Sequence, residues 1–187
     1  MLARAFWEDP IYTALFTDEV EREQALQRLF GAVVGYCLMY GLVHTTPAVE
    51  GAACWLTPGN TTVTFWRMLR AGLGLPRAMA QFNPQARQGF QAVLAYTDEI
   101  HKREAPGPHW HLWALGVEPG CQGQGIGSRL IRPVLAQADR DGVPCYLETE
   151  TDKNVAFYQK RGFNIVSDGV VPGQEVRIWT MLREARR

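Results

Sequence analysis

A glycine-rich stretch at residues 121–128 is the part of the sequence in which residue type and spacing point most directly to chemistry. It reads Cys-Gln-Gly-Gln-Gly-Ile-Gly-Ser and lies between a segment typical of a strand, Trp110–Val117, and one typical of a helix, Ser128–Arg140. Glycines at such a junction leave backbone N–H groups uncovered and aimed outward at the positive end of the helix. The stretch therefore predicts a binding site for a phosphate or pyrophosphate group.

Three nucleotide-binding motifs share glycines at this spacing, and the neighbouring residues exclude two of them. A dinucleotide fingerprint beginning at Gly123 needs glycine at position 128, which is Ser128. A Walker A loop needs lysine directly after its last glycine, but Ile126 follows Gly125. The remaining pattern, Q-x-x-G-x-G, consists of Gln122, Gly125 and Gly127. Taken alone, this pattern is also compatible with a purely structural turn.

A second group of residues follows about thirty positions after the glycine stretch. Asn154, Tyr158 and the pair Gly162-Phe163 form the pattern N-x-x-x-Y-x-x-x-G-F. A spacing of four places Asn154 and Tyr158 on the same face of a helix. Each residue alone has a structural explanation, as a helix cap or a half-buried core aromatic. The combination, at this distance from the glycine stretch, favours a shared functional site.

These motifs require an alternation of strands and helices to position them. Strands are predicted at Leu42–Thr46, Gly51–Leu56, Trp110–Val117, Cys145–Glu150, Phe163–Val166 and Val176–Met181. Helices are predicted at Leu2–Phe6, Val20–Tyr40, Ser128–Arg140 and Asn154–Arg161, with the first ending at Asp9-Pro10. A further helical stretch, about 61–103, is interrupted at Gly72–Pro76 and at Asn83-Pro84. The strand–helix–strand–helix–strand order from residue 110 predicts parallel pairing and then an antiparallel last strand.

The two motifs together resemble the coenzyme A loop and the following strand–helix region of the GNAT superfamily of N-acetyltransferases. The resemblance covers Trp110–Leu182 closely and the first hundred residues only loosely. Four local blocks are similar to the branch that contains puromycin N-acetyltransferase: Trp55-Leu56-Thr57-Pro58, Leu115-Gly116-Val117-x-Pro119, Leu147-Glu148-Thr149 and Asn154-x-x-Phe157-Tyr158. That branch joins small amine acceptors to acetyl-CoA.

The resemblance implies an α/β (α+β) fold, with a mixed central sheet of splayed parallel strands flanked by helices. It implies one domain, residues 1–187, with a helical insertion at about 61–103 that walls the acceptor side. Members of the superfamily begin with a strand before the first helix, whereas this sequence opens inside what corresponds to that helix. The usual first strand is therefore expected either to be absent or to lie upstream of the recorded start.

The implied activity is transfer of an acetyl group from acetyl-CoA to a primary amine of a small molecule, by direct attack in a ternary complex. Backbone groups of Leu115, Gly116 and Val117 are expected to accompany the pantetheine arm. The pyrophosphate is assigned to the amides of Gln122, Gly123, Gln124, Gly125, Ile126, Gly127 and Ser128, and Asn154 and Tyr158 complete the cofactor site. Tyr158 is also the candidate acid for the departing thiolate, because a phenol donates a proton near neutral pH.

The base is less clearly defined. His111 lies eleven positions before Gln122, where histone-acetylating members of the superfamily carry a glutamate base. Glu148 is a second candidate, and ordered water or simple core packing of His111 are alternatives. His109 and His111 form an H-x-H pair, but no third ligand is evident, since Cys121 belongs to the glycine stretch and His101 lies beyond two prolines. No metal site is predicted.

Composition excludes other classes of partner. Nineteen basic and nineteen acidic residues cancel, which gives no charge-based case for a nucleic acid or a membrane surface. The longest apolar run, Leu29–Val43, is shorter than the roughly 20 residues that span a bilayer. Four scattered cysteines and no secretory signal predict a cytoplasmic protein with reduced thiols, as a monomer or homodimer. A protein or peptide acceptor, and a non-catalytic acyl-CoA sensor, remain alternative functions.

Overall fold

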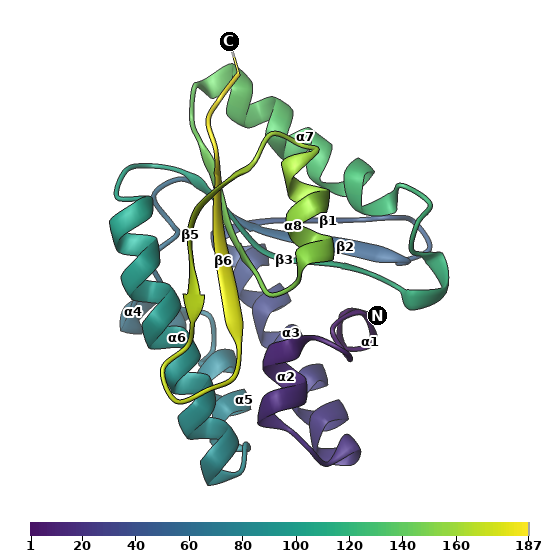
Figure 1. The fold of residues 1–187 in the computed structure, drawn as a ribbon, viewed down its shortest axis with the longest axis vertical. Helices are drawn as coiled ribbons and strands as arrows, with labels where there is room; N and C mark the ends of the chain where they lie inside the picture. Colours follow the sequence, from purple (N-terminus) through teal and green to yellow (C-terminus); the bar gives the residue numbers. More distant parts are fainter. Residues whose placement is uncertain (187) are drawn as a thin grey trace.

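A six-stranded mixed sheet forms the centre of the molecule (Figure 1). The computed structural model describes residues 1–186. The strands lie in the order β1-β2-β3-β4-β6-β5. They are β1 (Gly41–Thr45), β2 (Gly51–Leu56), β3 (Trp110–Val117), β4 (Cys145–Thr149), β5 (Asn164–Val170) and β6 (Arg177–Arg183). The predicted α/β fold with a mixed central sheet is confirmed.

Parallel pairing is less extensive than the sequence predicts. The strands β3 and β4 are parallel neighbours, and every other neighbouring pair in the sheet is antiparallel. The predicted parallel pairing of β4 with β5 is wrong, although the two strands run in the same direction. A turn at residues 171–176 reverses the chain, so β6 returns beside β5 and occupies the position next to β4.

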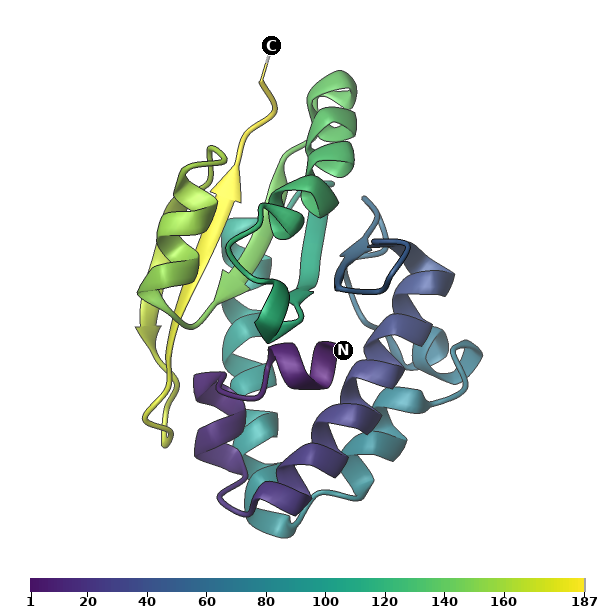
Figure 2. The same ribbon diagram turned by 90° about the vertical axis from the view of Figure 1, so that its right-hand side faces the viewer.

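Helices cover both faces of the sheet (Figure 2). They are α1 (Leu2–Ala5), α2 (Pro10–Leu15), α3 (Glu19–Tyr40), α4 (Phe65–Arg70), α5 (Gly74–Ala80), α6 (Pro84–Glu104), α7 (Ile126–Asp141) and α8 (Asp152–Gln159), with a short 3-10 turn at Pro119–Cys121. The side chains of Leu112 and Leu147 pack with those of α7 and α8 in one core. Two further cores lie on the opposite face, among α1, α2, α3 and α6. We call these the α7–α8 face and the α3–α6 face.

One helix starts where the sequence predicted an end. Asp9-Pro10 was expected to stop the first helix, and α1 does end before it, but α2 begins at Pro10. The Asp9 side chain caps α2 by accepting a hydrogen bond from the amide of Ile11 at 3.0 Å. Proline suits the first helical position because its missing N–H has no partner there. This cap places the Asp9 carboxyl at the sheet.

The segment 61–103 is helical, as expected, and contains α4, α5 and most of α6. Its predicted breaks fall at Leu73, which has a φ of 56°, and at Asn83, which caps α6. No strand precedes α3 within residues 1–186, and β1 pairs with β2 alone. None of the helices in these residues is long and apolar enough to cross a membrane.

Candidate active site

The glycine stretch forms a loop between β3 and α7. Gly123 and Gly125 have φ values of 78° and 75°, in the left-handed region where a side chain is strained. Gly125 directly precedes α7, so the amides of Ile126, Gly127 and Ser128 lie in its first turn. Amides of a first turn have no acceptor four residues back. The loop therefore presents uncommitted N–H donors, as a bound anion requires.

Basic side chains surround this loop, and the sequence interpretation missed them. Arg161 donates to Ser128 Oγ and lies over the Phe157 ring, 3.4 Å from its centroid. Lys153 approaches Gln122 Oε1 at 3.4 Å. Arg129 Nη1 bonds to the carbonyl oxygen of Gln124 at 3.0 Å in the same loop. A basic residue in the first turn after a glycine loop is a signal that could have identified Arg129, whereas Lys153 and Arg161 come from the separate helix α8 and the turn that follows it.

The strands β3 and β4 separate beside this loop. They pair from Trp110↔Cys145 to Leu112↔Leu147 and no further. Directly after Leu112, β3 carries a bulge at which Trp113 is an extra residue relative to β2. The segment Leu115–Val117 then pairs with β2 on one edge and has no strand on its other edge within the described chain. Its free backbone groups can bond to an extended ligand as an added strand would.

Tyr158 lies on the α7–α8 face. It is 7% exposed and packs in the same core as Leu112 and Leu147. Burial raises the pKa of its phenol well above the usual value, so the hydroxyl keeps its proton at neutral pH. Asn154 is half-buried one turn earlier in α8, and Thr151 rather than Asn154 caps this helix. Helix capping therefore does not explain the asparagine at position 154.

His111 and Glu148 lie on the opposite face. They alternate along their strands with Leu112 and Leu147, which point to α7 and α8. His111 Nε2 and Glu148 Oε2 are 2.7 Å apart. Burial raises the pKa of the Glu148 carboxyl, but the interactions with His111 outweigh this and leave it below its ordinary value. The structure thus joins the two base candidates and separates them from Tyr158 by the sheet.

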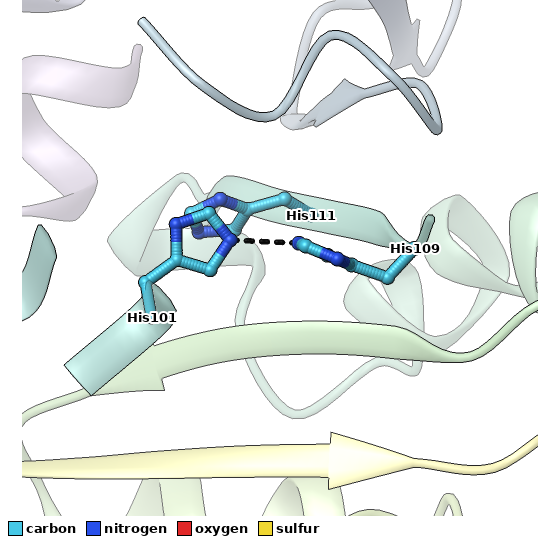
Figure 3. Close-up of side chains that lie close together, drawn as sticks. All are labelled: His101, His109 and His111. Carbon is cyan, nitrogen blue, oxygen red and sulfur yellow. Dashed lines mark hydrogen bonds between the residues drawn. The ribbon is translucent and has the colours of Figure 1, made fainter. Parts of the chain in front are cut away.

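His101 lies beside His109, which directly precedes β3, and His111, which belongs to β3 (Figure 3). Its Nε2 lies 2.7 Å from His109 Nε2, and its ring stacks on Tyr146. The inference that no third histidine lies near the H-x-H pair is wrong, because the short connection at 105–109 folds the end of α6 back beside the start of β3. Burial lowers the pKa of His101 to about 4 and also lowers that of His109, so both imidazoles are neutral at neutral pH.

A half-buried pair of carboxyl groups completes the α3–α6 face. Asp9, from the start of α2, lies against Glu150, which follows β4, with Tyr12 beside them. Burial raises the pKa of Asp9 to about 6 and raises that of Glu150 well above its ordinary value. The sequence interpretation missed this pair, because nothing in the local pattern connects position 9 with position 150.

Comparison with known sequences agrees with this geometry. A sequence model of the acetyltransferase (GNAT) family matches residues 78–163, which include the glycine loop and α8. An uncharacterized N-acetyltransferase of Schizosaccharomyces pombe is 29% identical over 168 residues, which are 87% of this chain and 67% of that protein. The N-alpha-acetyltransferase RimI of Mycobacterium tuberculosis is 37% identical over 76 residues, 40% of this chain and 47% of RimI.

Comparison with solved structures identifies the same fold. The crystal structure of a histone acetyltransferase HPA2 and related acetyltransferase from Corynebacterium glutamicum superimposes with a TM-score of 0.62. The match covers 100% of this chain and 88% of that chain at 18% sequence identity, a level at which the likeness concerns the fold alone. Together with the glycine loop and the separated strands, these sequence matches support the GNAT superfamily of acetyltransferases for this chain.

Proposed function

We propose that this protein transfers the acetyl group of acetyl-CoA to a primary amine of a small molecule, by direct attack in a ternary complex. The observation that carries the proposal is the separation of β3 from β4 directly beside the glycine loop. Tyr158 lies on one face of the sheet and the His111–Glu148 pair on the other. A thioester held between the two strands would be open to both.

The residues of the loop and of β3 fit coenzyme A. The uncommitted amides of the first turn of α7, with three cations nearby, suit the pyrophosphate. The free edge of Leu115–Val117 suits the amide groups of the pantetheine arm.

In the proposed reaction the amine nitrogen attacks the thioester carbonyl carbon, and the carbon–sulfur bond breaks. The thiolate takes the proton of the Tyr158 hydroxyl, which burial keeps protonated. The proton lost by the amine passes to the His111–Glu148 pair on the acceptor side. Solvent exchange returns both groups to their starting protonation states. Holding the two reactants in contact supplies the main advantage over the reaction in solution.

The small-molecule acceptor is supported by the α3–α6 face. The helical segment 61–103 adds α4, α5 and α6 on the side where His111 and Glu148 lie, and this suits an enclosed acceptor. The half-buried Asp9–Glu150 pair on the same face offers carboxyl oxygens that can accept hydrogen bonds from an amine. A peptide N-terminus is the second candidate, supported by the similarity to an enzyme named N-alpha-acetyltransferase. The puromycin-like branch, the cytoplasmic location and the monomer or homodimer state stay predictions.

Two measurements test the proposal. Calorimetry should show that acetyl-CoA binds one site per chain. Release of free thiol should then be followed with a panel of polyamines, aminoglycosides, aminonucleosides, amino acids and short peptides. We expect thiol release with at least one small amine and none without acceptor above the slow hydrolysis rate. Binding of acetyl-CoA without turnover across the whole panel would instead favour a sensor, and turnover with peptides alone would favour the second candidate.

A further inference from the structure

We propose that His101, His109 and His111 form a binding site for a divalent transition-metal ion of the zinc class. The three imidazoles come from two elements, the last turn of α6 and the start of β3 with the residue before it. Each offers one nitrogen, and these nitrogens lie within 4.8 Å of one another (Figure 3). The proposal does not depend on acetyl transfer.

The hydrogen bonds of His109 and His111 each leave one ring nitrogen with a free lone pair. His109 Nδ1 lies 2.7 Å from the carbonyl oxygen of Gly107, so this nitrogen carries the hydrogen and Nε2 can act as a ligand. His111 is held in the same manner, because its Nε2 is 2.7 Å from Glu148. Metal-binding histidines typically donate their second ring N–H to a carbonyl or a carboxylate, which fixes the ring and raises its basicity. His109 and His111 both have such a partner.

Because this cluster is buried, a polar atom in it that has no hydrogen-bond partner destabilises the fold. His109 and His111 are 3% and 5% exposed. His111 Nδ1 is buried without a hydrogen-bond partner among residues 1–186. Most buried polar side-chain atoms have a hydrogen-bond partner, because leaving one unpartnered destabilises the folded protein. A bound cation would give this nitrogen a partner.

The ligand type selects the class of ion. Imidazole nitrogen suits Zn²⁺, Co²⁺, Ni²⁺ and Cu²⁺, whereas Mg²⁺ and Ca²⁺ prefer oxygen ligands. Three protein ligands leave a fourth position for water or another ligand, as in zinc sites that are not purely structural. Tetrahedral zinc at about 2.0–2.1 Å from each nitrogen would hold two nitrogens about 3.3 Å apart. His101 and His109 are 2.7 Å apart, and the three nitrogens lie within 4.8 Å of one another, so binding requires the first pair to open by about half an ångström and the His111 nitrogen to approach by up to about 1.5 Å.

The competing explanation is a cluster of hydrogen-bonded neutral histidines. His101 Nε2–H would then donate to His109 Nε2 and hold α6 against β3 without any ion. This explanation leaves His111 Nδ1 unpartnered. The two explanations differ in one measurable quantity, the uptake of metal by the folded protein.

The experiment uses full-length protein without an affinity tag, treated with a chelator and then dialysed. Calorimetric titration with Zn²⁺ should show one site per chain with a micromolar or lower Kd. His109→Gln and His101→Gln should each weaken binding at least 30-fold. His44→Gln removes the one histidine outside the cluster, and Cys121→Ser removes the half-exposed cysteine, so both are matched controls that should bind like the unmodified protein.

Titration with Co²⁺ keeps the test informative if a histidine variant fails to fold. In the unmodified protein, Co²⁺ should give the visible absorption of a low-symmetry nitrogen-ligated site, and Zn²⁺ should remove it by competition. Circular dichroism checks that each variant is folded. Failure of the folded, unmodified protein to take up either ion overturns the proposal. If folded His109→Gln and His101→Gln bind zinc as tightly as the unmodified protein does, the proposal is also overturned, because the ion would then be bound elsewhere.

Discussion

The two faces of the sheet assemble their polar groups in different ways. On the α7–α8 face, the glycine loop, Asn154 and Tyr158 all come from one stretch of about forty residues, 122–158. On the α3–α6 face, Asp9, His101, His111, Glu148 and Glu150 come from four separate parts of the chain. The first arrangement depends on local backbone geometry, and the second depends on the packing of α2 and α6 against the sheet.

This difference suggests a division of labour within the site. A cofactor shared by many enzymes can be bound by a local motif, because backbone amides and glycines at fixed spacing are enough. An acceptor that differs between enzymes requires side chains brought together by each protein's own insertions. We therefore expect mutations on the α7–α8 face to alter acetyl-CoA binding or thiolate protonation, and mutations on the α3–α6 face to alter use of the acceptor.

The largest effect is expected from Tyr158→Phe. The change removes one hydroxyl from a side chain that is otherwise packed in the core, so the fold should be retained. Loss of a general acid lowers turnover by about 10²- to 10³-fold. The Kd for acetyl-CoA, measured by calorimetry, should stay within about twofold. Tyr96→Phe, in α6, is the matched control and should leave kcat unchanged. Equal kcat values in the Tyr158 variant and the unmodified protein would remove Tyr158 from the reaction.

Glu148→Gln should lower kcat by about 10- to 100-fold without changing the Kd for acetyl-CoA. The amide keeps the shape of the carboxylate but loses its charge, so it holds His111 less firmly and cannot accept a proton. Initial rates at saturating acetyl-CoA separate the effects on kcat and on acceptor KM. The exposed Glu99 of α6 provides the control Glu99→Gln. A change in acetyl-CoA affinity instead of turnover would contradict the proposal that the α3–α6 face affects use of the acceptor and not binding of acetyl-CoA.

The sequence predicts the α7–α8 face well because its signals are short-range. The glycines at 123 and 125 indicate a loop with left-handed backbone positions, and the apolar periodicity of 128–140 indicates the helix that follows it. The strand order fails at β5 and β6, because a hairpin can place either strand next to β4 and periodicity does not distinguish the two cases. Asp9-Pro10 serves equally as a helix stop and as a cap followed by a first helical residue.

The α3–α6 face could not be predicted in the same way. His101 and His109 are separated by two prolines, and only the fold-back of the chain between α6 and β3 brings their rings to hydrogen-bonding distance. The contact between Asp9 and Glu150 spans most of the chain. Such convergence depends on how α2 and α6 pack, and packing is decided by the whole core rather than by any local pattern.

Gly125→Ala should weaken acetyl-CoA binding about tenfold. A side chain at a left-handed position costs about 1–2 kcal/mol, and the backbone can relieve this strain only by turning the loop amides away from the phosphate site. Turnover at saturating acetyl-CoA should change much less. Gly120→Ala is the matched control, because Gly120 has no positive φ and no atom lies within 4 Å of its added Cβ. Equal weakening by both variants would show that glycine flexibility, not amide direction, is what matters.

Arg161→Gln should weaken acetyl-CoA binding by about three- to fivefold, less than the change at Gly125. The guanidinium is held between Phe157 and Ser128, so it adds positive charge to the loop at little entropic cost. Because the interaction is electrostatic, the variant should also show a shallower fall in affinity as salt is added. Arg140→Gln, exposed at the far end of α7, is the control. An unchanged salt dependence in the Arg161 variant would contradict a role in binding phosphate.

The smallest effect, on stability rather than activity, is expected from Asp9→Asn. The folded protein binds the Asp9 proton more tightly than the unfolded chain does, because burial raises the carboxyl pKa from 3.8 to about 6. Stability therefore falls as pH rises from about 4 to 6, and the loss persists above pH 6. Asparagine cannot ionise and still caps α2. Thermal unfolding should show a Tm about 2–4 °C higher than that of the unmodified protein at pH 7.5, and no difference at pH 4.

Asp18→Asn is the matched control, since Asp18 caps α3 in the same way but is exposed. It should give no gain in Tm at pH 7.5. A fall in Tm for Asp9→Asn at every pH would instead mean that the α2 cap needs the negative charge of the aspartate. A gain at pH 7.5, together with a higher acceptor KM, would show that the chain retains a destabilising carboxyl pair on the α3–α6 face because the amine acceptor binds to it. The α7–α8 face offers backbone amides to its ligand, so ligand binding there does not require a destabilising carboxyl pair.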